Sequence, residues 1–229
     1  AMNNLAGDPA HKATLNRMRA RLFARMLELR DTGLLTEEEI RVRSGGTTAY
    51  GMAQDEERYG LGRVAEAAKL VGMGPRHKER LIALLGDDDS AVRYWAATGL
   101  AVFGAGAREA SASLLALRED PSDSVRVAAA EALCGIGETE AGLAMLGEVL
   151  ETASPFARYE ACAVLVRLGA AAAPLEDRVE QVIQDIKQLD YAERRHLLAA
   201  VGHVLHGIPG NTTVPDPAQG FHEWCYANE

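Results

Sequence analysis

Three segments of the chain align without gaps: VRYWAATGLAVFG (residues 92–104), VRVAAAEALCGIG (125–137) and ARYEACAVLVRLG (157–169). They are offset by 33 and 32 residues. Each has Arg in second place, Ala in fifth, Leu in ninth and Gly in last place, and each follows a shorter apolar stretch with helical spacing. A period near 33 residues, built from a pair of helices, is typical of an α-solenoid. The sequence therefore predicts an all-α fold in which helix pairs stack into an α-α superhelix.

The phase of the small and apolar residues predicts the buried face of each second helix. In the first repeat this face consists of Val92, Ala96, Gly99, Leu100 and Phe103. The closing glycine of each repeat predicts a helix end, because the left-handed conformation there favours Gly. A fourth pair, at about residues 175–189 and 192–206, keeps the helical period but lacks the Arg and the closing Gly. We therefore expect about four helix pairs, the last one a degenerate cap.

A long capped helix is predicted upstream of the repeats. Asp8 is a good N-cap, Pro9 suits the first helical position, and Gly33 follows the end. The apolar stripe of this helix consists of Leu15, Met18, Leu22, Met26 and Leu29, and its basic face of Lys12, Arg17, Arg21 and Arg25. The basic face is either a solvated surface or a site for an anionic polymer such as a sulfated glycan.

Shorter elements should join this helix to the repeats. Thr36 and Glu39 form a capping box for a helix that ends near Arg43. SGGTTAYG (residues 44–51) is a loop by composition, and a further helix covers about residues 61–71. The predicted parts are a terminal helical element (1–43), a loop with a short connecting helix (44–74), the repeats (75–207) and an extended C-terminal strap (208–229).

Composition and charge narrow the classes of partner. The 229 residues are 48% hydrophobic but only 5% aromatic, and 24 Lys and Arg face 33 Asp and Glu, for a formal net charge of −9. An acidic body disfavours nucleic acid, which requires a concentrated positive surface. We find no apolar run long enough to cross a bilayer and no charged-then-apolar leader, so we expect no membrane partner. The compartment stays open, because it depends on whether a longer parent carries a signal peptide.

Acidic residues precede two of the repeat arginines at equal spacing. In DDDSAVR, Asp87 stands six residues before Arg93, and in DPSDSVR, Asp120 stands six before Arg126. These segments resemble HEAT-like repeats, including the short variety of the phycobilisome lyases. The resemblance implies a ladder in which the acidic turn residue and the Arg join neighbouring repeats.

The third repeat departs from this pattern. It has Arg158, but Thr152 stands in the place of Asp120, and the nearest acid is Glu151. Apart from the resemblance, an Asp near a helix N-terminus satisfies free backbone donors, and an Arg one turn further along can bridge to it. We therefore interpret these charges as structural.

No constellation of catalytic or metal-binding residues emerges. Cys134, Cys162 and Cys225 are widely spaced without a C-x-x-C pair, which predicts neither a disulfide framework nor a zinc site. His196 and His203 share a helix face, but no Glu stands beside them as in H-E-x-x-H. A nucleophile elbow, a P-loop and a dinucleotide fingerprint are all missing. We expect this chain to be no enzyme and to hold no metal or cofactor.

The opening stretch carries a second resemblance. NNLAGDPAHKATLNRMRARLFARMLELRDTGLL (residues 3–35) resembles the end of the catalytic region of bacterial sulfatases related to N-sulfoglucosamine sulfohydrolase. There, an N-L-A-x-D-P segment is followed by a terminal helix and an R-D-T-G-L-L turn, and some members continue into a HEAT-like extension. The resemblance implies that residues 1–43 are the last element of a missing catalytic region, which would use formylglycine and calcium. The C/S-x-P-x-R motif needed for formylglycine is not present in this chain.

Two functions remain open. One is a non-catalytic C-terminal accessory region of a sulfatase that hydrolyses sulfate esters or N-sulfates, with the catalytic region as its partner in cis. The other is a free-standing repeat protein that binds proteins through its concave face. Tyr94, Val127 and Tyr159 occupy equivalent positions on the second helices, where they either line that concave groove or are buried between repeats. The stripe of the first helix, including Leu15, Met18, Leu22 and Met26, should fold back or associate with another chain, such as a second copy.

Overall fold

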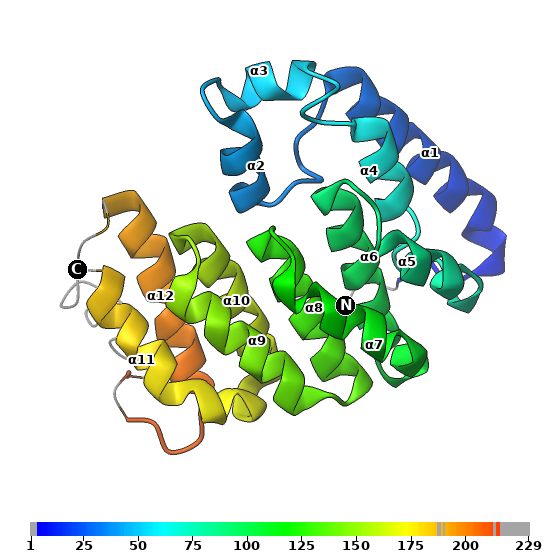
Figure 1. Ribbon diagram of the computed structural model, residues 1–229. Coiled ribbons are helices and arrows are strands. Elements are labelled where there is room, and N and C mark those ends of the chain that lie inside the picture. Colours follow the sequence, from blue (N-terminus) through cyan, green and yellow to red (C-terminus); the bar gives the residue numbers. More distant parts are fainter. Residues whose placement is uncertain (1–3, 187–188, 190, 213, 216–229) are drawn as a thin grey trace.

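The computed structural model describes residues 4–186, 189, 191–212 and 214–215, and all regular structure in this part of the chain is helical. This confirms the predicted all-α solenoid. Four helix pairs follow one another in a row, from α5 and α6 at one end to α11 and α12 at the other (Figure 1). The first helices are α5 (Lys78–Leu84), α7 (Ser111–Ala116), α9 (Thr139–Thr152) and α11 (Glu176–Asp185). The second helices are α6 (Ser90–Phe103), α8 (Asp123–Ile136), α10 (Pro155–Leu168) and α12 (Tyr191–Gly207).

Local signals fix the ends of the second helices. Gly104, Gly137 and Gly169 stand at the C-terminal ends with φ values of 50°, 99° and 55°, where a side chain would be strained. At the N-terminal ends, Ser122 and Ser154 accept hydrogen bonds from the backbone N–H groups three residues further along. The second helices therefore begin and end at defined residues.

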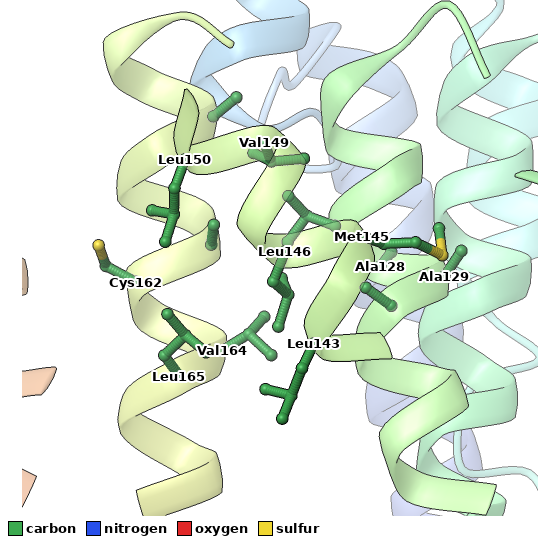
Figure 2. Packing of buried hydrophobic residues seen from close by; sticks show 14 of the residues in the cluster. Ala128, Ala129, Leu143, Met145, Leu146, Val149, Leu150, Cys162, Val164 and Leu165 are labelled. Carbon is green, nitrogen blue, oxygen red and sulfur yellow. The ribbon is translucent and has the colours of Figure 1, made fainter. Parts of the chain in front are cut away.

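Small residues let neighbouring helices approach closely, both within a pair and between successive pairs. A Cβ atom on Gly99 would lie 2.8 Å from Leu81 Cδ1, and one on Gly142 would lie 2.6 Å from the carbonyl oxygen of Ala130. In Figure 2, the apolar side chains of α9 lie between α8 and α10, with Leu146 and Val149 at the centre. Both of these side chains are fully buried. The chain can form a well-packed core despite its low aromatic content, because Ala and Gly let the helix backbones lie close together.

The region before the repeats has its own small core. It contains α1 (Lys12–Leu29), α2 (Glu37–Ser44), α3 (Ala49–Gln54) and α4 (Leu61–Ala68). Met52 and Tyr59 are fully buried there, together with apolar residues of α4 and α6. Because α4 packs against α6, it extends the row of second helices by one position.

Two expectations need correction. The segment 44–51 is not all loop, because Thr48 caps α3 by accepting a hydrogen bond from the backbone N–H of Gly51. The stretch Ser90–Glu119 is long and apolar enough to cross a membrane by length and composition, although we predicted no such run. The chain turns within it at Gly104, and α6 packs against α4, α5 and α8. A core helix of a repeat protein meets the same criteria of length and composition, so this stretch is only weak evidence for a membrane span.

Candidate interaction surfaces

Helix α2 lies across the N-terminal ends of three second helices. It contacts α8 and α10 and bonds to the start of α6 (Figure 1). Of the capping box predicted from Thr36 and Glu39, the Thr36 half begins this helix, since Thr36 Oγ1 accepts a hydrogen bond of 3.2 Å from the backbone N–H of Glu39. The Glu39 carboxylate instead accepts hydrogen bonds from residues farther along the chain. Glu38 and Glu39 of the first turn face the solenoid, whereas Glu37 is exposed.

Two carboxylates of α2 hold this contact. Glu39 accepts hydrogen bonds from Ser122 Oγ (2.6 Å, to Oε1) and Ser90 Oγ (2.7 Å, to Oε2). Glu38 Oε2 accepts one from Ser154 Oγ at 2.6 Å. Both glutamates are only 5% exposed. The partial positive charge of the helix N-termini favours carboxylates at this position.

Arginines of α2 complete the cluster. Arg41 pairs with Glu38, and Arg43 pairs with both Glu39 and Asp89, the N-cap of α6. Burial alone would raise the pKa of Glu38, but the hydrogen bonds from Arg41 and Ser154 outweigh it and lower that pKa. The pKa of Asp89 is lowered in the same way, with the bond from Arg43 outweighing burial. Glu38 and Asp89 are therefore stabilised as ionised carboxylates in this contact.

A polar hollow of about 530 Å³ lies beside this contact, between α2 and the turns before α6 and α8. Its basic lining residues are Arg43, Arg63 and Arg93, and acidic side chains including Glu57, Asp88 and Asp123 face them. Arg43, Arg63 and Arg93 each pair with an aspartate. The hollow is thus a surface of paired charges between elements.

The residues of the expected ladder lie in these turns. Arg93 makes a bidentate pair with Asp120, with Nε–Oδ2 at 2.7 Å and Nη2–Oδ1 at 2.9 Å, and both side chains are largely buried. It also donates to the carbonyl oxygens of Asp87 and Asp88 in its own repeat. Arg93 thereby joins the turn of its own repeat to the turn of the next.

Asp87 pairs with a residue that the sequence analysis missed. Its Oδ1 lies 2.6 Å from Arg63 Nη2 of α4. The signal was GRVAEAAKL (residues 62–70), which is similar to the core of the second repeat segment VRVAAAEAL. The arginine row therefore begins one helix earlier than the aligned repeats.

Of the next two arginines, Arg126 behaves differently from Arg93, whereas Arg158 repeats its pattern of contacts. Arg126 pairs with Asp123 of its own helix, because Thr152 offers no carboxylate in the following turn. Arg158 Nη1 lies 3.3 Å from Asp185 Oδ2 of α11, a second partner that the sequence analysis missed. Its Nη2 and Nε donate to the carbonyl oxygens of Glu151 and Ala153.

The three equivalent side chains on the second helices differ in exposure. Tyr94 is half-buried and packs edge to face on Trp95, with ring centroids 5.5 Å apart. Val127 is 3% exposed and belongs to the core, so it lines no groove. Tyr159 is 46% exposed. Of the two readings left open for this position, burial applies to Val127 and a surface position to Tyr159.

Helix α1 is attached to the rest of the chain through a small contact. No residue of α1 is buried, and Met18 and Leu22 are 64% and 58% exposed. Leu15, Phe23 and Met26 are half-buried, and Lys69 Nζ lies 5.0 Å from the centroid of the Phe23 ring. A groove of about 1300 Å³ runs between α1 and residues 68–76. The apolar stripe is therefore only partly covered by this chain.

The family comparison agrees with the repeat architecture. A family described as HEAT repeats matches residues 111–189, which span helices α7 to α11. No curated protein and no solved structure gives a significant match. The stacked helix pairs and this match define the class of the molecule, an α-helical solenoid with HEAT-like repeats. Such repeats generally mediate protein–protein interactions. The sulfatase resemblance lies in residues outside the matched segment and stays a prediction.

Proposed function

We propose that the chain is a non-catalytic protein-binding module that forms the C-terminal accessory region of a sulfatase, with α1 docked on the catalytic region in cis. The observation that carries this proposal is the apolar stripe on α1. Exposed Met18, Leu22 and Leu29 lie on a helix that has no buried residue and touches the small core through half-buried Phe23 and Met26. Burying one such side chain fully stabilises a contact by about 1.5–3 kcal/mol.

The resemblance of residues 3–35 to a sulfatase suggests what would cover the apolar stripe of α1. The segment that resembles the end of a sulfatase catalytic region contains α1, so that helix would normally pack on the sheet that precedes it. The repeats would then extend from the catalytic region as a rigid arm. The parent would hydrolyse sulfate esters or N-sulfates with formylglycine and calcium, neither of which is assigned to residues of this chain.

The parent gene gives the first test of this proposal. The region upstream of Ala1 should encode an alkaline-phosphatase-like domain with a C/S-x-P-x-R motif. In the whole parent, Met18→Asp together with Leu22→Asp should detach the repeats, which small-angle scattering would detect as a larger radius of gyration. Val102→Asp is the matched control, because Val102 is equally exposed but lies on α6. An upstream region without the motif, or an unchanged radius in the double variant, would contradict the proposal.

A second function is favoured by a different surface. Val102 of α6 and Tyr159 and Val166 of α10 are exposed apolar side chains on the second helices. A free-standing interaction module would bind its partner there. In that case Val102→Asp with Val166→Asp would abolish partner binding, and the α1 double variant would not.

A further inference from the structure

A third carboxyl group lies where α2 meets the solenoid. Ser124 of α8 is fully buried, and its Oγ lies 2.7 Å from Thr36 Oγ1 of α2 and 3.1 Å from Glu160 Oε1 of α10. These side chains form a chain of contacts through the interface, from α2 to α10 by way of α8. Glu160 is the only carboxyl group in that chain.

The surroundings of Glu160 do not suit an ionised carboxylate. Its Oε2 is shielded from solvent and makes no hydrogen bond. A carboxylate has about four acceptor positions, and the hydroxyl groups of Ser124 and Thr36 fill at most two of them. A buried acceptor without a donor destabilises the charged form strongly.

The neighbouring charges also disfavour the ionised form of Glu160. On α2, Glu38 and Glu39 raise the pKa of Glu160, and the arginines that pair with these two are engaged with them. On α6, the pKa of Tyr94 is raised by burial and by the charge of Glu160. Helix α12 also packs on α10 and brings Arg194, whose Nε is buried without a hydrogen bond. Among charged groups, the main effects on the pKa of Glu160 therefore come from the carboxylates of Glu38 and Glu39.

Docking of α2 creates part of this environment. Burial, followed by the charges of Glu38 and Glu39, raises the pKa of Glu160 to about 7, although hydrogen bonds from Ser124 and Thr36 act against it. Withdrawal of α2 would remove Thr36 and both acidic neighbours and would let water reach the carboxyl group. Proton binding at Glu160 and docking of α2 are then thermodynamically linked.

We propose that Glu160 is a pH-sensitive latch: its protonated form holds α2 against α8 and α10, and its ionisation loosens α2. The sign follows from the linkage. Because the docked state binds the proton more tightly than the released state, docking weakens as pH rises between the usual glutamate range and about 7. Released α2 would uncover Ser122 and Ser154 at the starts of α8 and α10.

Hydrogen exchange of the whole chain tests the latch. After correction for intrinsic exchange, the backbone amides of residues 39–44 should be about tenfold less protected at pH 8 than at pH 5.5. Glu160→Gln should abolish this pH dependence, since the amide cannot ionise. Glu131→Gln is the matched control: Glu131 is a carboxyl group on α8 paired with Arg167, and its loss should leave the pH dependence intact.

Two further measurements test the proposal without the Glu160→Gln variant, in case that variant does not fold. In a Trp224→Phe background, Trp95 is the single remaining tryptophan, and its Nε1 donates a 2.8 Å hydrogen bond to the Leu34 carbonyl beside α2. Its emission should shift to the red between pH 5.5 and 8. Carbon NMR of Glu160 should show a carboxyl titration near pH 7. A midpoint below pH 5.5, or equal protection of α2 at both pH values, would overturn the proposal.

Discussion

Helices α1 and α2 are neighbours in the chain, yet the shorter and more polar one is the better buried. Helix α1 has an apolar stripe over 18 residues and no buried side chain, whereas α2 has eight residues and buries two glutamates. The difference lies in what each helix meets. Helix α2 finds serine hydroxyls, an aspartate and the N-terminal ends of three helices. Helix α1 meets α4, the segment after it and the edge of the small core, where Phe23 and Met26 are half-buried. An apolar stripe therefore marks a surface that needs a partner, and it does not by itself locate that partner within the chain.

The largest effect should come from the solenoid core. Leu133→Ala removes a fully buried side chain of α8 and should lower the free energy of unfolding by about 4 kcal/mol, because a cavity remains. Leu22→Ala makes the same chemical change on α1 and should cost less than about 0.5 kcal/mol. Urea unfolding of both variants measures the contrast. Equal losses would mean that α1 is packed as well as α8.

The buried ion pair between repeats should rank next. Asp120→Ala leaves Arg93 without its bidentate partner and should destabilise the fold by about 3 kcal/mol. Glu148→Ala breaks the more exposed pair with Arg118 and should cost less than about 1 kcal/mol. If the two variants unfold at the same urea concentration, the ladder contact has no special role.

The α2 contact should contribute less than the core. Glu39→Ala leaves Arg43, Ser90 and Ser122 without their shared acceptor, and we expect a loss of about 2 kcal/mol. Glu37→Ala, on the exposed side of the same helix, should change stability by only a few tenths of a kcal/mol. Thermal unfolding by circular dichroism compares the two. An equally mild effect of both would show that α2 is held by its apolar residues alone.

The smallest effect on stability, and the clearest on association, is expected at α1. The wild-type chain alone should sediment faster as its concentration rises, because the exposed stripe can pair with a second copy. The Met18→Asp and Leu22→Asp double variant should sediment as a monomer at all concentrations with an unchanged unfolding curve. A wild-type chain that stays monomeric at high concentration would count against the stripe as an interaction surface.

The fold could be predicted from sequence because its signals are local and repeated. The helix period, the closing glycines and the N-cap at Thr36 each act within a few residues. The Arg63–Asp87 pair could also have been found, since GRVAEAAKL carries a weak copy of the repeat.

The position of α2 could not be predicted in this way. Its contacts join Glu39 to Ser122 and Glu38 to Ser154, which are 83 and 116 residues apart in the chain. These residues belong to different local motifs, an acidic first turn and two serine caps, and each motif is complete without the other. Burial of Val127 was likewise undecided, because its position in the repeat is the same as that of exposed Tyr159. Neighbouring helices, not the repeat itself, decide which of the equivalent side chains is covered.

Hydrogen exchange of α1 and α2 in the same sample tests the contrast between them most directly. In the isolated chain at pH 5.5, the amides of α2 should approach the protection of α8, and those of α1 should exchange at least a hundredfold faster than those of α8, through openings that cost little. In the whole parent, α1 should gain protection to the level of α2. Protection of α1 equal to that of α8 in the isolated chain would contradict the proposed difference between the two N-terminal helices.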